Sequence, residues 1–424
     1  MAWSRGTKTE YDSWTQFAQG EDWSWNGLLP YFKKGNTIKA NQSNPFPGLS
    51  ESERKAGNDP NFVGYGGPIH SGLNSFYADP VFPWVKTLNN LGVKTNSNPE
   101  NGDNNGILNS RSNVNFDTGR RSYADEYYCR STRKPNFHVL TGAQVTKVLF
   151  VTHKYEKNLI ASGVQFVVGD EYFVANASKE VILAAGTFQS PQLLELSGIG
   201  NAKLLKGLNI TSLIDIPSVG ENLQDHWAVV TQLELEPGHL TFDELRNNAT
   251  FAQEQTAFYN RTGGGMLGAT TTGLAFLPTK LYLDKKQSDL LLASYDRSVS
   301  ALEPTLLQRV HFDLQRQWLR GNVPAIELIQ FSTGFLGGEA NKSYISLIVA
   351  GMHHLSRGSV HVNSTDPLAH PVINPNLLNN EFDSQLLLGA LRLVYRAAST
   401  LPMKNLIKQM TSPDPLATDA ALLE

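Results

Sequence analysis

One cysteine, little net charge and no long hydrophobic run set the first limits on this chain of 424 residues. The single cysteine, Cys129, excludes an internal disulfide and any metal site built from several cysteines. We expect it to be buried or half-buried on a helix, because no candidate base neighbours it in the sequence. The formal charge of −3 gives no reason to expect nucleic acid or an anionic membrane as a partner. No apolar run approaches the ~20 residues of a membrane helix.

A hydrophobic content of 40% with 18% charged residues is typical of a globular protein, and the length suits two or three domains. The first residues, MAWSRGTKTEYDSW, have neither a basic start nor an apolar core, so we do not expect them to be a signal peptide. Seven N-glycosylation sequons nevertheless favour a secreted glycoprotein. The alternative is that several of these sequons arose by chance, because the sequence is rich in Asn, Ser and Thr. The sequon asparagines are Asn41, Asn176, Asn209, Asn248, Asn260, Asn341 and Asn363.

The stretch from residue 119 to 225 has an α/β pattern with an antiparallel insertion. We expect a helix over 121–130, followed by the strands FHVLTG, QVTKVLFV, ASGVQFVV, EYFVAN and EVILAA. The turn at Gly169-Asp170 predicts a hairpin. The segment EVILAA lacks alternation, which is typical of a parallel strand buried on both faces.

After that strand, residues 186–200 predict a turn and a short helix. Ser190 suits the N-cap, Pro191 the first helical position, and Gly198 the left-handed end of the helix. The small residues Ala184, Ala185 and Gly186 permit close approach of a ligand or of another chain segment. A buried strand packed on a helix explains this stretch equally well.

Other segments predict ordinary elements. We expect helices at WSWNGLLPYFKK, with Asn26 as a candidate cap, over 78–91, and over 381–400 with an apolar stripe at helical spacing. Strands are expected at AIELIQFS and YISLIVAGM.

The familiar catalytic and phosphate-binding motifs are missing or misplaced. The only G-x-G-x-x-G, Gly263 to Gly268, follows a helical segment instead of a strand, so we expect a flexible loop. No G-x-S-x-G supports a serine hydrolase, and no H-E-x-x-H or spaced His/carboxylate set predicts a metal site. We interpret His226 as a polar core residue.

Several stretches together resemble the flavin-dependent glucose–methanol–choline (GMC) oxidoreductases, in the family's order and over essentially the whole chain. Among its branches the chain looks most similar to the aryl-alcohol oxidases. The stretches are YDSW, WSWNGLLPYFKK, GRRSYADEYY, PNFHVLTGAQVTKVLF, SPQLLELSGIG, VGENLQDH, SRGSV and DP…INPN.

The resemblance implies an FAD-binding Rossmann-like α/β domain interleaved with a substrate domain built on an antiparallel sheet. Its implied activity is oxidation of a small-molecule alcohol, with hydride transfer to FAD and reoxidation by O₂ or a quinone. The corresponding segments are 1–65 (flavin attachment and lid), 66–118 (substrate domain), 119–225 (FAD domain), 226–352 (substrate domain) and 353–424 (start of the C-terminal region).

The resemblance also assigns cofactor contacts. Val145 corresponds to an adenine-contacting backbone position, and Ala184, Ala185 and Gly186 lie beside the ribose–pyrophosphate. Met1 and Ala2 match the end of the motif N-x-M-x-[YW]-x-R-G, which wraps the flavin.

Two family motifs have no match in the chain, namely the first βαβ unit with its glycine loop and the H-P-x-G-T motif that carries the catalytic histidine. We therefore expect a fragment with no catalytic residue of its own, weak FAD binding and little activity. His370-Pro371 lacks the Gly and Thr of H-P-x-G-T and is not expected to be catalytic. A non-catalytic glycoprotein or pseudoenzyme and a hydroxynitrile lyase stay open as alternatives.

Overall fold

The computed structural model describes residues 2–18, 20–115, 117–132, 134–152, 158–270, 272–414 and 417–423. The chain divides into two compact units. Unit 1 consists of Met1–Arg133, His226–His354 and Asn380–Glu424, and unit 2 of Lys134–Asp225 and Leu355–Asn379. Both units are discontinuous in sequence. The five domain segments expected from the sequence stay predictions.

Unit 1 is built on a six-stranded sheet in the order β20-β14-β17-β16-β15-β4. All its pairings are antiparallel, which confirms the antiparallel-sheet domain. The central strand β17 is buried at every position, whereas β16 alternates between buried and half-buried side chains. The strands are β4 (Gly106–Leu108), β14 (Ala228–Leu235), β15 (Leu274–Leu277), β16 (Ile326–Phe331), β17 (Tyr344–Gly351) and β20 (Ile407–Ser412).

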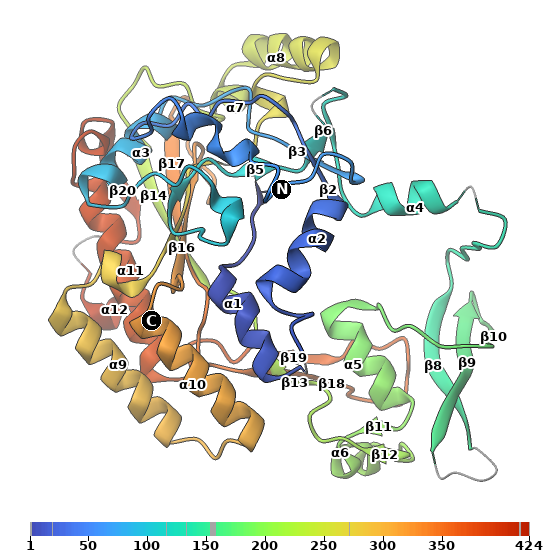
Figure 1. Ribbon diagram of the computed structural model, residues 1–424. Coiled ribbons are helices and arrows are strands. Elements are labelled where there is room, and N and C mark those ends of the chain that lie inside the picture. Colours follow the sequence, from blue (N-terminus) through green and yellow to red (C-terminus); the bar gives the residue numbers. More distant parts are fainter. Residues whose placement is uncertain are drawn as a thin grey trace. The chain divides into compact units, whose positions relative to one another are not determined.

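Helix α11 (Glu381–Ala398) packs against β17 and against α9 (Lys285–Ser300), and α9 lies beside α10 (Leu306–Arg320) (Figure 1). The helix begins where the Asn380 side chain accepts a hydrogen bond from the Asp383 N–H at 3.0 Å. The predicted apolar stripe is confirmed, since its residues are buried. They are Phe382, Leu386, Leu387, Ala390, Leu391 and Val394.

The rest of unit 1 consists of short elements. The strands are β1 (Ala2–Trp3), β2 (Asn36–Ile38), β3 (Ile69–Ser71), β5 (Arg111–Ser112), β6 (Val114–Asn115) and β7 (Arg120–Arg121). The helices are α1 (Lys8–Ser13), α2 (Trp25–Gly35), α3 (Val81–Asn90), α4 (Asp125–Ser131), α7 (Glu244–Asn247), α8 (Ala249–Thr262) and α12 (Asp419–Leu423). Ser24, and not Asn26, caps α2, because its Oγ accepts from the Gly27 N–H at 3.2 Å.

Unit 2 contains the predicted hairpin, with β9 and β10 joined at Gly169-Asp170 and paired antiparallel, and β8 on the other side of β9. Its strands are β8 (Gln144–Thr152), β9 (Leu159–Val168), β10 (Glu171–Asn176), β11 (Ile199–Gly200), β12 (Ile214–Asp215), β13 (Glu221–Leu223), β18 (Gly358–His361) and β19 (Val372–Asn374). Its helices are α5 (Gly186–Leu196) and α6 (Ala202–Gly207).

Two predicted strands of this stretch were wrong. Residues 180–185 form no strand, and Ile182 is 77% exposed. A parallel strand buried on both faces needs hydrogen-bonding neighbours, and no strand among the described residues pairs with this segment. FHVLTG is also irregular, with Val139 and Leu140 exposed.

Three further sequence predictions have clear outcomes. The glycines Gly263 to Gly268 follow helix α8, which confirms that they do not form a strand-borne phosphate loop. Cys129 lies on helix α4 as expected, but it is exposed and not buried. His226, expected as a polar core residue, is exposed. Among the described residues, no helix is both long enough and apolar enough to cross a membrane.

Candidate functional site

The residues expected to contact FAD fall into both units. Val145 lies on β8 opposite Phe166, and Ala184, Ala185 and Gly186 lead into α5, all within unit 2. Helix α5 packs on β8, where the Ser197 Oγ accepts a hydrogen bond from the Val148 N–H at 2.9 Å. Ala2 belongs to β1 of unit 1, paired with Ser112, and Met1 lies outside the described residues.

Helix α5 begins earlier than the sequence predicts. The helix begins at Gly186, four residues before the predicted cap Ser190, so Pro191 lies within it. The N-cap residue Ala185 makes no side-chain capping hydrogen bond, and Gly186 is exposed with open space around its Cα. Uncapped N–H groups at a helix start favour an anionic group. The assignment of this helix start to the FAD pyrophosphate stays a prediction.

A left-handed glycine stands at each end of α5. Gly186 has φ +81° and Gly198 has φ +86°. The latter confirms the predicted end of the helix. An added Cβ at Gly198 would lie 2.5 Å from the Thr211 carbonyl oxygen, whereas none of the described atoms lies within 4 Å of one at Gly186. The glycine at the helix start is therefore needed for its backbone conformation, and the one at the end for close packing as well.

A carboxylate–imidazole–carboxylate cluster joins three segments of unit 2. The fully buried Glu195 of α5 contacts His361 Nδ1 at 2.8 Å and accepts from the Val362 N–H at 2.8 Å. His361 Nε2 contacts Glu221 at 3.1 Å. Burial by itself lowers the pKa of His361, but the hydrogen bonds and charges of Glu195 and Glu221 outweigh it, and the pKa is raised. This cluster holds α5, β13 and β18 together.

Unit 1 contains an apolar cavity of about 360 Å³ that sequence reasoning did not find. Four aromatic side chains form much of its wall, and several Thr and Ser hydroxyls complete it. A mainly apolar lining with a few polar groups is typical of a small-molecule site. The lining residues are Phe76, Tyr77, Ala78, Val81, Phe242, Ala269, Thr270, Thr272, Gln330, Phe331, Ser332 and Thr333.

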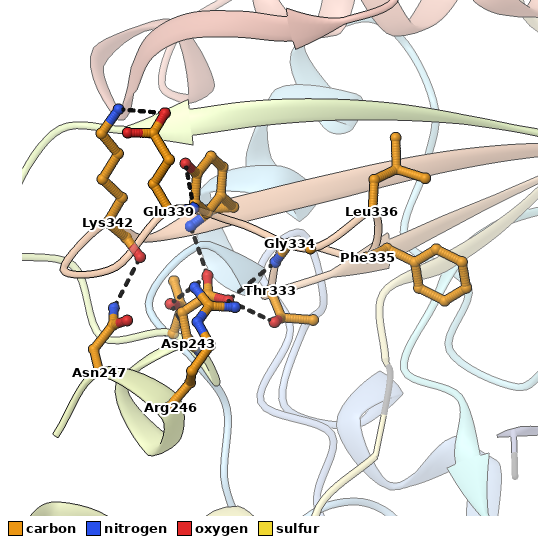
Figure 2. A network of polar contacts seen from close by, with 12 residues as sticks. Asp243, Arg246, Asn247, Thr333, Gly334, Phe335, Leu336, Glu339 and Lys342 are labelled. Atoms are coloured by element: carbon orange, nitrogen blue, oxygen red, sulfur yellow. Dashed lines mark hydrogen bonds and ion pairs between the residues drawn. The ribbon is translucent and has the colours of Figure 1, made fainter. Parts of the chain in front are cut away.

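Figure 2 shows the polar network that fixes one side of this cavity. The buried Asp243 accepts hydrogen bonds from the Thr333 Oγ1 at 2.8 Å, the Gly334 N–H at 3.2 Å and the Tyr344 N–H at 2.7 Å. It also pairs with Arg246 at 3.2 Å. These bonds hold both ends of the loop between β16 and β17.

That loop presents two apolar side chains, Phe335 and Leu336, which point away from the network in Figure 2. They are 55% and 56% exposed. The Phe335 ring lies 5.3 Å from the ring of Phe331, which lines the cavity. The network therefore orients an aromatic pair that extends from the cavity wall to the surface of unit 1.

Glu327 is the most unusual carboxyl of the six-stranded sheet. It is half-buried on β16, paired through its backbone with Phe276 of β15 and Ala350 of β17, and its carboxyl makes no hydrogen bond or ion pair with any described residue. Burial raises its pKa to about 7. Such a carboxyl can exchange a proton at neutral pH. Glu327 does not line the cavity, however.

Two further histidines, His370 and His353, do not line the cavity. His370 is exposed in the segment before β19, and His353 pairs with Glu10 at 2.9 Å beside Trp318. Within the described ranges no group of three or more His, Cys, Asp or Glu side chains is arranged to hold a metal ion.

Known proteins match this sequence along nearly its whole length. Two GMC oxidoreductase family profiles match residues 1–228 and 354–422. A dehydrogenase from Armillaria gallica is 36% identical over 405 residues, which cover 92% of this chain and 62% of that protein. The GMC oxidoreductase family protein Mala s 12 of Malassezia sympodialis is 30% identical over 413 residues, covering 96% and 63%. The chain thus spans less than two thirds of the length of these relatives.

Solved structures share the fold. An FAD-dependent oxidoreductase from Chaetomium thermophilum superimposes with a TM-score of 0.85 at 27% identity, covering 100% of this chain and 72% of that one. A fungal aryl-alcohol oxidase gives a TM-score of 0.82 at 23% identity, with the same coverage. The family and its FAD-dependent structures indicate FAD as the cofactor. On the family profiles and the two sequence relatives, this chain belongs to the GMC oxidoreductase family.

Proposed function

We propose that the protein containing this chain oxidises a small, predominantly apolar alcohol. When bound, FAD supplies the hydride acceptor for such a reaction. Residues Val145 and Ala184 to Gly186 of unit 2 would hold the cofactor, with the uncapped start of α5 toward its pyrophosphate. Met1 and Ala2 stay as the predicted contacts on the flavin side.

The substrate class rests on one observation, the cavity of unit 1. Its aromatic residues Phe76, Tyr77, Phe242 and Phe331 favour an aromatic or other flat apolar group, and the Thr and Ser side chains of the lining add a few polar atoms. The Phe242 ring meets Phe76 edge-on at 5.9 Å. The role of these residues is to bind the substrate and exclude water.

Flavin spectroscopy tests the activity. The whole protein is purified with FAD, and its flavin absorbance is followed under argon while benzyl alcohol is added. We expect the flavin bands to bleach with alcohol and to return with O₂ or with a quinone, which also identifies the acceptor. A protein that carries flavin but is not bleached by any alcohol would refute the proposal.

A substitution pair tests the substrate site. Phe242→Ala removes one aromatic wall, and we expect KM for benzyl alcohol to rise about tenfold, which corresponds to about 1.4 kcal/mol. Phe258→Ala is the matched control, because Phe258 is 40% exposed on α8 and does not line the cavity. Equal KM values for the two variants would exclude the cavity as the substrate site.

Two alternatives keep the fold without alcohol oxidation. Release of cyanide from an aromatic cyanohydrin, with no bleaching by alcohols, would support a hydroxynitrile lyase. Purified protein that neither retains FAD nor converts either compound would support a non-catalytic glycoprotein or pseudoenzyme.

We further propose that the protein is secreted. The support is the set of seven sequons, because N-linked glycans are added only in the secretory pathway. Fractionation of source cells and medium tests this, and a protein confined to the cytosol would contradict it.

A further inference from the structure

The proposed reaction makes no use of the seven N-X-S/T sequons. The structure gives all seven asparagines exposed side chains, four in unit 1 and three in unit 2. They stand after β2 (Asn41), in β10 (Asn176), after α6 (Asn209), at and within α8 (Asn248, Asn260), in the β16–β17 loop (Asn341) and after β18 (Asn363).

Exposure is not a general property of asparagine in this chain. Six asparagines are buried: Asn36, Asn44, Asn74, Asn98, Asn104 and Asn109. None of the six is followed two residues later by Ser or Thr. Along the described chain, therefore, no sequon asparagine is buried and no buried asparagine belongs to a sequon.

The atom that would carry a glycan is also unengaged. An N-linked glycan replaces one hydrogen of Nδ2, so an Nδ2 that donates a structural hydrogen bond is a poor attachment point. Asn36, Asn74 and Asn104 donate such bonds to other parts of the fold. None of the seven sequon asparagines donates one from Nδ2 to any residue that the structure describes.

Asn248 shows how attachment leaves the local structure intact. Its Oδ1 caps α8 by accepting from the Phe251 N–H at 3.1 Å, while its Nδ2 donates to no described residue. The capping bond needs only the oxygen, which a glycosylated amide keeps. Asn260 lies near the other end of this helix, which has no buried residue.

Backbone conformation accounts for part of the pattern but not for all of it. Asn41, Asn209 and Asn341 have φ of 58°, 59° and 62°, a left-handed conformation that asparagine tolerates at turns. A turn explains the asparagine in these three cases. It does not explain the Ser or Thr two positions later, nor the four sequons with ordinary backbone.

We propose that these seven asparagines are N-glycosylation sites and that the mature protein carries glycans on both units. This rests on the proposed secretion and names the modified atoms, each Nδ2. No sequon asparagine lines the apolar cavity of unit 1, so glycans attach away from its walls. The bulky, hydrated groups would instead cover turns, the edge strand β10 and helix α8.

Site mapping tests the proposal. The native protein is isolated from its source and treated with peptide-N-glycosidase in H₂¹⁸O, which converts each glycosylated Asn to ¹⁸O-labelled Asp. We expect label at the seven sequons and none at Asn322 or Asn405, which are exposed but lie outside any sequon. Protein found in the medium without label would overturn the glycosylation but leave secretion standing. Unlabelled protein found only in the cytosol would overturn both.

A substitution pair gives a second, independent readout. Thr250→Ala destroys the sequon of Asn248 but keeps the side chain that caps α8, whereas Thr250→Ser keeps the sequon. On expression in a glycosylating host, we expect the alanine variant to lose one glycan by gel mobility and mass, and the serine variant to retain it. Equal glycan numbers in the two variants would contradict occupancy at Asn248.

Discussion

The buried carboxylate of Asp243 accepts a hydrogen bond from the backbone N–H of Tyr344 at 2.7 Å, although 101 positions separate the two residues. Together with its bonds to Thr333 and Gly334, this contact closes the base of the loop between β16 and β17. The loop geometry beside the cavity therefore depends on one acid from a distant segment.

Asp243→Ala is expected to lower the free energy of unfolding by about 3 kcal/mol, because it leaves buried donors without an acceptor. Urea denaturation of the purified chain measures this. Lys285→Ala is the control, since its pair with Asp289 is exposed on both sides, and its effect should stay within about 0.5 kcal/mol. Similar midpoints for the two variants would show that the network contributes little to stability.

Glu327→Gln should change the pH dependence of stability. The folded-state pKa of Glu327 is raised from 4.5 to about 7 by burial. The folded protein therefore keeps a proton that the unfolded chain releases, and the free energy of unfolding falls as the pH rises through this window. The glutamine variant should lose that slope and gain at most about 3 kcal/mol at neutral pH.

Glu381→Gln is the opposite-sign control for Glu327. Its hydrogen bond to Arg297 lowers the pKa of the Glu381 carboxyl, so its stabilising effect is present above pH 4.5 and is lost as the pH falls. Between pH 4.5 and 7 this variant should keep the wild-type slope. Thermal melts across that range measure the slope for both variants. If Glu327→Gln keeps the wild-type slope, Glu327 is not the group that causes it.

His361→Gln should flatten the stability profile on the alkaline side. The carboxylates of Glu195 and Glu221 raise the pKa of His361 above 6.5 despite its burial. The stabilisation by the protonated imidazole is therefore complete below pH 6.5 and is lost as the pH rises through the folded-state pKa. We expect the wild-type melting temperature, but not that of the variant, to fall over this interval, as measured by circular dichroism.

Gly186→Ala tests the helix start assigned to the cofactor. The residue has φ +81° with no described atom near an added Cβ, so the cost is backbone strain of about 1 kcal/mol, without a clash. Gly207→Ala in α6 has equally open surroundings and no positive φ, and it should be neutral or slightly stabilising. If both variants unfold at the same urea concentration, the strain argument fails. Weaker FAD retention in Gly186→Ala alone would support the cofactor contact.

The sequence by itself determined the features that depend on local pattern. The hairpin at Gly169-Asp170 follows from turn chemistry and alternation, and the buried stripe of α11 from helical spacing. Family membership also followed from local sequence, because the motifs are short and occur in a fixed order. The hydrophobic content of residues 180–185 predicted a buried strand, which was wrong because Ile182 is exposed.

Only the tertiary structure decided which distant residues meet. Strand formation at residues 180–185 requires a neighbouring strand, which no local pattern supplies. The pairing of Asp243 with Tyr344 and of Glu195 with His361, and the cavity between Phe76 and Phe331, join segments more than 100 positions apart. That no sequon asparagine donates from Nδ2 to a described residue likewise follows only from the tertiary structure. Burial, shifted pKa values and cavities depend on many contacts between residues far apart in the chain. The local pattern of a single sequence does not show which of these residues meet.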